Sequence, residues 1–240
     1  PFAMEMDNFF VDREKTPLGK DGKPDFESLQ AMDLKRLYAD VRDLVAGKEV
    51  QLPKFDFIRG RSLEGERAKL NKGDIIILEG IHGLNPGLMP NLSRENTFRI
   101  YVSCLTQLNL DRHNRISTTD TRMLRRILRD ARDRGYSALD TIRRWESVRQ
   151  GEKVHIFPYQ EHADAIFNSA LAYELTTLKP LVEPLLRQVP FGTPEYIEAK
   201  RLLKFLEWFL PTGSEYVPGN SILREFIGGS ILTEFSLWKK

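Results

Sequence analysis

The chain has 240 residues and a formal net charge of only +2, which gives no indication of a nucleic-acid-binding protein. Its 41% hydrophobic and 10% aromatic residues are typical of a folded chain and exclude an intrinsically disordered one. No run approaches the roughly 18 consecutive apolar residues that a membrane-spanning helix needs.

The first 110 residues predict short strands, one loop and one helix. Glycines, prolines and charges predict a loop over residues 12–25, and a 3.6-residue apolar spacing predicts a helix over residues 28–46. The strongest strand signal lies at residues 74–79, where four unbroken apolar residues predict a buried strand that ends at Glu79. Further strands are predicted at residues 1–6, 50–58 (strand or extended loop) and 97–103.

The second half of the chain is mainly helical in pattern. The spacing predicts helices over residues 121–133 and 138–150, a short strand at 163–167, a helix through Leu186 and an amphipathic helix at 195–209. The polar face of the last helix mixes Glu with Lys and Arg, which favours packing on protein over binding to a membrane. Alternating strands and helices predict an α/β fold with a mostly parallel sheet flanked by helices.

Two carboxylates follow predicted strands and are the first candidates for chemistry. Glu79 ends the apolar strand, at the sheet edge where magnesium and phosphates collect in α/β proteins. Asp7 follows the first strand beside Asn8, Phe9 and Phe10, and it could act as a general base toward a substrate hydroxyl. Taken singly, each has an ordinary structural alternative: Glu79 as a solvated strand end and Asp7 as a turn-forming residue.

An arginine-rich segment is the third candidate. Six arginines fall between Arg122 and Arg134, and most follow helical spacing. Guanidinium groups suit bidentate phosphate contacts and can neutralise charge on a transferring phosphoryl group. One alternative is a solvated helix face with ion pairs such as Arg126–Asp130, and another is nucleic-acid binding. The absence of interleaved aromatic residues argues against the second alternative.

The histidines and the cysteine show no metal-binding pattern. The four histidines are scattered, and none lies at ligand spacing from Cys104. His82 is distinguished only by its position three residues after Glu79. A single cysteine cannot form an internal disulfide, which indicates a reducing compartment and predicts a cytoplasmic protein.

Taken together, these segments resemble the uridine kinase family, within the phosphoribulokinase/uridine kinase group of P-loop kinases. The resemblance covers residues 1 to about 180 in order and spacing. The motifs that carry it are Met6-Asp-Asn-Phe-Phe10, Asp25-Phe-Glu27 opening a helix that reaches Asp33, Leu52-Pro-Lys-Phe-Asp-Phe57, Ile75-Ile-Ile-Leu-Glu-Gly-Ile81, Asp120-Thr-Arg-Met-Leu-Arg-Arg-Ile-Leu-Arg-Asp130, Arg134-Gly135, and Ala163-Asp164 with Asn168.

The resemblance implies roles for individual residues on the acceptor side. Asp7 would be the general base for the nucleoside 5′-hydroxyl, and Glu27 would bind the ribose hydroxyls, where the family usually has Asp. Phe55, at a position often held by Tyr, and Phe57 would line the base pocket. Gly60 replaces a histidine that contacts the base in some members.

The resemblance also implies the donor side. Glu79 would lie near Mg²⁺, and ATP would be the phosphate donor. The lid arginines Arg122, Arg125 and Arg126 would be catalytic, Arg129 would contact the nucleotide and Arg134 would contact the substrate phosphates. The reaction would be in-line transfer of the γ-phosphoryl group to uridine or cytidine.

One family element is missing from these residues. No G-x-x-x-x-G-K-[ST] loop occurs in the sequence, although such a loop holds the β- and γ-phosphates in P-loop kinases. In the family it lies about thirty residues before the position of Asp7, after the central strand of the sheet. We therefore expect the first strand and this loop to precede Pro1 in the natural protein. Without them, we expect a protein of residues 1–240 to catalyse the reaction inefficiently.

The expected domains are a uridine kinase-like domain at residues 1–189, with a lid at about 111–150, and a helical extension at 190–240. The segment 221–230 is similar to a longer bacterial subgroup in which domains resembling the N-terminal part of threonyl-tRNA synthetase precede the kinase. Nucleoside and ATP are the expected partners, and a homo-oligomer is compatible with the sequence. Neither a membrane nor a nucleic acid is expected as a partner. The alternatives are a same-fold kinase for a sugar phosphate or pantothenate, a non-catalytic nucleotide-binding module and an RNA-associated protein.

Overall fold

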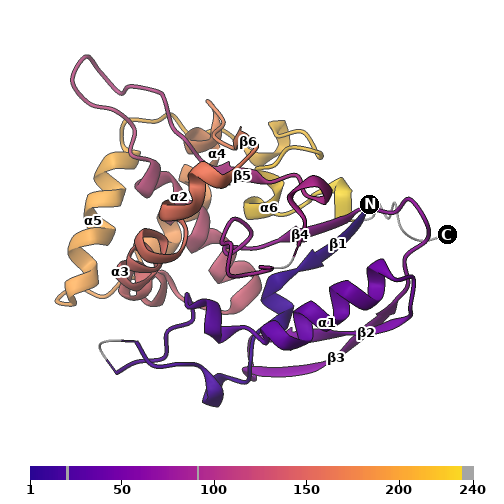
Figure 1. The fold of residues 1–240 in the computed structure, drawn as a ribbon. Coiled ribbons are helices and arrows are strands. Elements are labelled where there is room, and N and C mark those ends of the chain that lie inside the picture. Colours follow the sequence, from indigo (N-terminus) through magenta and orange to yellow (C-terminus); the bar gives the residue numbers. More distant parts are fainter. Residues whose placement is uncertain (20–21, 91, 234–240) are drawn as a thin grey trace. The chain divides into compact units, whose positions relative to one another are not determined.

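The computed structural model describes residues 1–19, 22–90 and 92–233, and these residues form two compact units. The first unit contains residues 1–101 and 148–165, and the second contains residues 102–147 and the described residues from 166 onward. The chain combines helices with strands, among them a parallel pair, which confirms the predicted α/β class (Figure 1). The boundary expected at residue 189 stays a prediction, and part of the expected extension, residues 234–240, lies outside the described residues.

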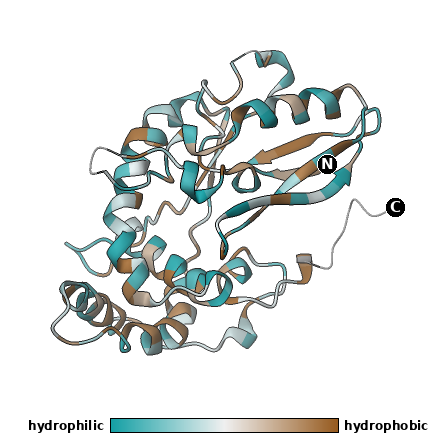
Figure 2. Ribbon diagram, turned by 90° about the horizontal axis from the view of Figure 1, so that it is seen from below, coloured by the Kyte–Doolittle hydropathy of each residue, from teal (hydrophilic) through white to brown (hydrophobic). Residues whose placement is uncertain are grey.

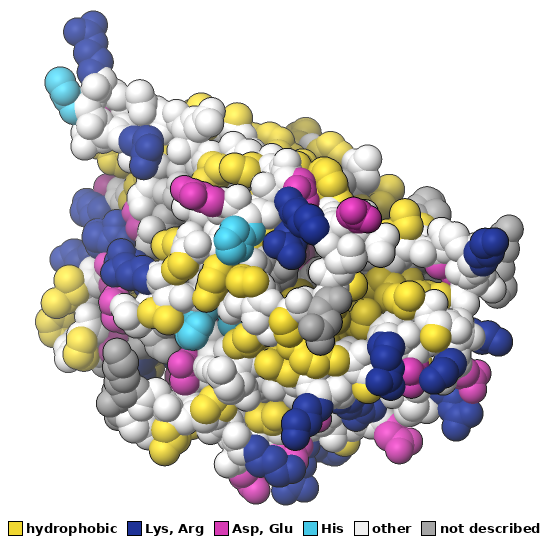
Figure 3. Space-filling view, viewed as in Figure 1, with side chains coloured by type: hydrophobic (Ala, Val, Ile, Leu, Met, Phe, Trp, Pro, Cys, Tyr) yellow, Lys and Arg dark blue, Asp and Glu magenta, His cyan; other side chains and the backbone are white. Residues whose placement is uncertain are grey.

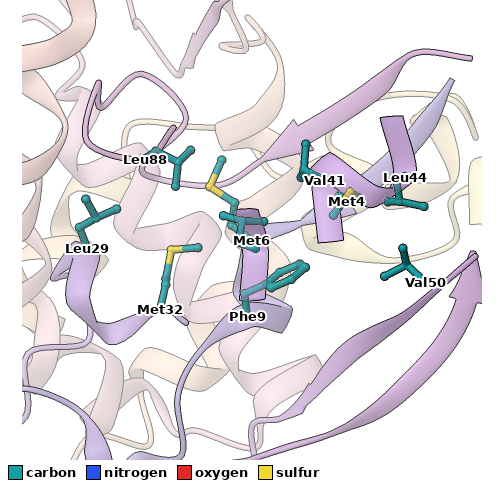
Figure 4. Close-up of a cluster of buried hydrophobic side chains, with 10 residues drawn as sticks. Met4, Met6, Phe9, Leu29, Met32, Val41, Leu44, Val50 and Leu88 are labelled. Atoms are coloured by element: carbon teal, nitrogen blue, oxygen red, sulfur yellow. The ribbon is translucent and has the colours of Figure 1, made fainter. Parts of the chain in front are cut away.

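A parallel pair of strands is at the centre of the first unit. Strand β1 (Phe2–Glu5) runs parallel to β4 (Ile76–Glu79), with Phe2 opposite Ile76 and Glu5 opposite Glu79. Helix α1 (Leu34–Val45) contributes buried residues to the same core as β1. This core consists of Met4, Met6, Phe9, Leu29, Met32, Leu37, Val41, Leu44, Val50 and Leu88, most of which Figure 4 labels.

Strand β4 is less buried than its apolar sequence predicts. Ile76 and Leu78 are half-buried against the core, but Ile75 is 67% exposed and Ile77 is 49% exposed. Among the described residues β4 pairs with β1 alone, so the prediction of a fully buried strand is wrong here. Figure 2 shows brown, apolar strands beside the N-terminus, and Figure 3 shows that apolar side chains also reach the surface elsewhere.

A β-hairpin follows α1 in the first unit. Strand β2 (Val50–Asp56) pairs antiparallel with β3 (Arg61–Ala68), with a register irregularity between Gln51 and Pro53. The sequence did not predict β3, because Arg61-Ser-Leu-Glu-Gly-Glu-Arg-Ala68 lacks regular apolar alternation. Backbone pairing with β2 therefore outweighs a weak local strand signal.

The predicted helix over residues 28–46 begins too early. Helix α1 begins at Leu34, because the side chain of Asp33 accepts a hydrogen bond from Arg36 N at 3.0 Å and caps the helix. Ser28 caps only a short 3-10 turn, Leu29–Ala31. Phe10 then forms a bridge with Met32, which holds the backbone extended just before the cap. The motif Asp25-Phe-Glu27 therefore lies in a loop, and the prediction that it opens a helix is wrong.

The second unit is mainly helical. Helix α2 (Thr118–Arg129) is capped by Ser117 and continues into a π-turn, Asp130–Arg134, which ends at Gly135 with a φ of +68°. Helix α2 packs against α4 (Glu174–Leu186) and α6 (Arg224–Ile227), and α4 packs against α5 (Pro194–Leu206). The core of the second unit includes Leu124, Ile127, Leu178, Val182, Leu186, Leu202 and Leu206.

Three elements, α3 (Ala138–His155), β5 (Ile100–Ser103) and β6 (Ala165–Asn168), are shared between the units. Helix α3 begins in the second unit, and its residues from Val148 onward belong to the first. Strand β5 pairs with β6 in a separate two-stranded sheet. No helix among the described residues combines the length and the apolar character that crossing a membrane requires.

Candidate functional site

Asp7 lies in a 3-10 turn, Met6–Phe9, directly after β1. The turn is anchored because Met6 and Phe9 are both buried in the core, whereas Asp7 itself is only half-buried. Asn8 fixes the turn on both sides: its amide nitrogen donates to Glu5 at 3.1 Å, and its amide oxygen accepts a hydrogen bond from Phe55 N at 3.1 Å. Asn8 thus ties the predicted general base to the strand that carries the predicted base pocket.

Three aromatic rings lie next to one another at this end of β2. The ring of Phe55 makes edge-to-face contacts with Phe10 at 5.7 Å and with Phe57 at 5.2 Å between ring centroids. Phe55 is buried, whereas Phe57 is 38% exposed. Of the two predicted pocket residues, Phe57 is therefore the one that offers a ring to a ligand, with Phe55 supporting it.

The predicted ribose-binding residue, Glu27, lies in a loop held by the end of α3. Asp25 accepts a hydrogen bond from Glu27 N at 3.1 Å, and His155 lies 4.0 Å from the carboxylate of Asp25. A Cβ atom on Gly151 would lie 2.5 Å from Cβ of Glu27. The glycine therefore allows the side chain of Glu27 to rest directly on the helix backbone.

His82 is buried beside this loop. It is 1% exposed, and neither ring nitrogen forms a hydrogen bond among the described residues. Burial and the nearby His155, whose ring centroid is 5.8 Å away, lower the pKa of His82 to about 4, although the peptide groups of Ser28 and Glu27 and the charge of Asp25 oppose the shift. His82 is therefore neutral at pH 7.

Glu79 has an acidic neighbour that the sequence alone did not indicate. The parallel register places Glu5 directly opposite Glu79 at the ends of β1 and β4, and both residues are exposed. Among the described residues, no group of three or more metal-ligating side chains is close enough to hold an ion. Mg²⁺ in kinase sites is usually bound by one or two carboxylates together with substrate phosphates, so this pair fits such an ion.

Arg125 is the most deeply buried of the predicted lid arginines. It is 4% exposed and donates to Glu174 at 2.6 Å, to the carbonyl oxygen of Ser169 at 2.7 Å and to the hydroxyl of Ser169 at 3.2 Å. The thiol of Cys104 lies 3.7 Å from the other oxygen of Glu174, and burial and that carboxylate raise the thiol pKa to about 11. These contacts give Arg125 a structural role in the second unit, and its predicted catalytic role stays a prediction.

The other predicted arginines reach the surface of the second unit. Arg126 and Arg134 both pair with the buried Asp130, at 3.4 and 3.2 Å, and Arg129 pairs with Glu225 at 3.1 Å. Arg122, Arg126, Arg129 and Arg134 are all half-buried. Each residue therefore keeps part of its surface accessible to solvent, which phosphate binding requires.

The second unit also contains a pocket of about 190 Å³. It lies among the loops that follow β5 and β6, where ligands bind in open α/β sheets. Polar atoms come from Thr106, Thr121, Asn168 and Glu174, and the apolar part is lined by Leu105, Leu108, Ile116, Ala170, Leu171 and Leu175.

The structure thus gathers the predicted residues into two groups. Asp7, Phe55 and Phe57 are linked through Asn8 in the first unit, which also contains Glu27 and Glu79, whereas the predicted arginines belong to the second unit. Sequence reasoning missed Glu5 and Gly151. The alternation of β1 could have indicated Glu5, but Gly151 becomes noticeable only through a contact between distant segments.

Comparison with known proteins identifies the family. Residues 4–175 match the model of the Phosphoribulokinase / Uridine kinase family. The chain belongs to this family. The match confirms the resemblance inferred from the sequence motifs, and it agrees with the α/β fold of parallel strands flanked by helices.

Individual relatives match about two thirds of the chain. A uridine kinase of Lactobacillus helveticus is 28% identical over 164 residues, which are 68% of this chain and 70% of the relative. A uridine kinase of Mycoplasma genitalium is 27% identical over 173 residues, 72% of this chain and 73% of the relative. Uridine kinase-like protein 5 of Arabidopsis thaliana is 27% identical over 164 residues, which cover 68% of this chain but 32% of that protein.

Proposed function

We propose that this protein is an ATP-dependent nucleoside kinase that phosphorylates the 5′-hydroxyl of uridine or cytidine. Family membership supports a kinase, and two of the relatives described above are named uridine kinases. The observation that carries the acceptor is the link from Asp7 through Asn8 to Phe55 and Phe57. A carboxylate next in the chain to the side chain that binds this aromatic strand suits a ligand that combines a hydroxyl group with a flat base.

On the acceptor side, Asp7 takes the proton of the 5′-hydroxyl as its oxygen attacks the γ-phosphorus. Its half-buried turn holds the carboxylate in place while leaving it accessible. Phe57 stacks on the base with Phe55 behind it, and Glu27 binds the ribose hydroxyls from the loop held by Gly151. Together these contacts orient the hydroxyl for in-line attack.

On the donor side, the accessible arginines Arg122, Arg126, Arg129 and Arg134 bind phosphate oxygens and offset their charge. Arg125 supports them by holding α2 against Glu174. Glu79 and Glu5 would hold Mg²⁺, which would neutralise phosphate charge. The pocket beside Thr106 and Asn168 takes the base of the nucleotide donor, because it combines apolar walls with a few polar groups.

The phosphate-binding loop comes, in this proposal, from a segment outside residues 1–240. Among the described residues β4 pairs with β1 alone, and Ile75 and Ile77 are exposed; both observations support this part of the proposal, because the strands of parallel sheets are normally covered on both faces. Residues 1–189 would then be the kinase domain with its lid at about 111–150, and residues 190–240 its helical extension. Domains resembling part of threonyl-tRNA synthetase would precede it, and the protein would act in the cytoplasm.

Two rival functions stay open to test. A non-catalytic nucleotide-binding module would bind uridine without phosphorylating it in any form of the protein. An RNA-associated protein would bind RNA with strong salt dependence, lost on substitution of Arg126 or Arg129. The formal net charge of only +2 and the family match favour the kinase over the RNA-binding alternative.

Phosphoryl transfer from ATP to uridine tests the proposal. We expect a protein extended upstream to be active, residues 1–240 alone to be far slower, and Asp7→Asn in the extended protein to lose about 10²- to 10⁴-fold in kcat. Asn71→Ala, at a turn in the same unit, is the matched control and should keep full activity. Equal rates for the short and extended proteins would overturn the proposed upstream loop, and an unaffected Asp7→Asn would overturn the role of Asp7.

A further inference from the structure

The turn between β2 and β3 contains a glycine whose backbone and surroundings both exclude a side chain. Gly60 has a φ of +68°, in the left-handed region that favours glycine, and its amide donates to Asp56 O at 2.7 Å. A Cβ atom here would lie 2.7 Å from Nε and 2.8 Å from Cζ of Arg13. The guanidinium group of Arg13 therefore occupies the space that a side chain at position 60 would take.

Arg13 is held in this place by its backbone and its side chain. Its amide donates to Gly60 O at 2.9 Å, and a guanidinium nitrogen donates to Phe57 O at 2.8 Å. Among the described residues this is the one hydrogen bond of the side chain, and Arg13 is exposed. A guanidinium group has five N–H donors, so Arg13 keeps donors for a ligand on Phe57.

The orientation of a bound base follows from the chemistry of pyrimidine nucleosides. The sugar is attached to N1, and C4 lies on the opposite side of the ring. If the ribose binds Asp7 and Glu27 and the base stacks on Phe57, the C4 substituent points away from the carboxylates. This substituent is an oxygen acceptor in uracil and an amino donor in cytosine.

We propose that Arg13 is the residue that selects uridine over cytidine, which rests on the proposed nucleoside kinase function. The guanidinium group of Arg13 donates to the C4 oxygen of uracil. Toward cytosine it would present donors to a donor, leaving both groups without a partner. The backbone contacts to Phe57 and Gly60 fix the arginine for this discrimination.

Calorimetric titration of residues 1–240 with uridine and with cytidine tests this proposal. We expect the unmodified chain to bind uridine roughly 10- to 100-fold more tightly, the range for a hydrogen bond to a charged group. Arg13→Met should bring the ratio of the two affinities close to one, mainly by weakening the binding of uridine. Arg59→Met is the matched control, because Arg59 is an exposed arginine on the same turn, 3.7 Å from Asp56, and it should leave the ratio unchanged.

The ratio of the affinities for uridine and cytidine distinguishes selection of the base by Arg13 from a purely structural role of Arg13. Loss of a purely structural contact would weaken the binding of both nucleosides equally. An unchanged ratio of the two affinities in Arg13→Met therefore overturns the proposal. The riboside of 2-pyrimidinone, which lacks the C4 oxygen, gives a second test on the unmodified chain: it should bind about as weakly as cytidine, and binding equal to uridine overturns the proposal. Binding of neither nucleoside would overturn the proposed function itself, and the role of Arg13 with it.

Discussion

His82 in the first unit and Arg125 in the second are both buried titratable groups, but they are accommodated in opposite ways. The always-charged guanidinium of Arg125 has partners, because Glu174 and Ser169 accept its hydrogen bonds within 3.2 Å. His82 has no hydrogen-bond partner among the described residues, and its pKa falls to about 4, so it is neutral. A buried group either acquires a partner or loses its charge, and the two choices give different responses to mutation and to pH.

The largest effect is expected from breaking the buried pair in the second unit. Arg125→Met leaves the Glu174 carboxylate buried without a counter-charge, and we expect the free energy of unfolding to fall by about 3–5 kcal/mol. Urea unfolding measures this, and Arg125→Met/Glu174→Leu should recover much of the loss.

The matched control for this prediction is an exposed pair in the same unit. Lys204 lies 3.1 Å from Glu207, and both side chains are largely exposed, so Lys204→Met should change the free energy of unfolding by less than about 1 kcal/mol. Equal losses of unfolding free energy for Arg125→Met and Lys204→Met would show that the buried pair contributes no more to stability than the exposed pair.

The second prediction concerns the unpaired histidine of the first unit. Its ordinary pKa of 6.5 falls to about 4 on folding, so between these pH values the unfolded chain binds more protons. Stability should therefore rise with pH from about 4 to 6.5 and be fully present above that range. Acidification should remove up to about 3 kcal/mol.

Unfolding titrations at several pH values check the role of His82. His82→Leu should flatten the pH dependence in this range, whereas His113→Leu, at an exposed position in the second unit, should leave it intact. An unchanged slope in His82→Leu would mean that His82 is not the group responsible for the pH dependence.

A smaller effect is expected at Gly151, where helix α3 meets the loop of Glu27. Gly151→Ala places a Cβ atom 2.5 Å from Cβ of Glu27, and overpacking of this kind costs about 1–3 kcal/mol. The same change should raise the KM for nucleoside more than it lowers kcat, because it displaces Glu27. Glu27→Gly should restore the stability but not the KM.

The neighbouring position offers the control for Gly151. Gln150→Ala changes an exposed residue of the same helix. It should change the free energy of unfolding by less than about 0.5 kcal/mol, and the KM for nucleoside by no more than the factor that corresponds to this free energy. If Gly151→Ala behaves like Gln150→Ala, the close approach of Glu27 to the helix has no energetic importance.

Sequence patterns predicted the parts of the fold that depend on local order. The apolar runs of β1 and β4, the Asp7 turn and the arginine helix all follow from spacing and composition. Local patterns could not show that α1 begins after Asp33 rather than after Ser28, because a bridge between Phe10 and Met32 holds the preceding backbone extended. The contact of Gly151 with Glu27 and the burial of Arg125 likewise depend on residues distant in sequence.

Uridine binding by residues 1–240 is the most direct test of the acceptor site. Calorimetry should show saturable one-to-one binding that Phe57→Ala weakens at least about ten-fold, as expected for loss of a stacking ring. Phe98→Ala, an exposed phenylalanine of the same unit, should bind like the unmodified chain. No binding by the unmodified chain, or equal binding by both variants, would contradict a nucleoside site at Phe57.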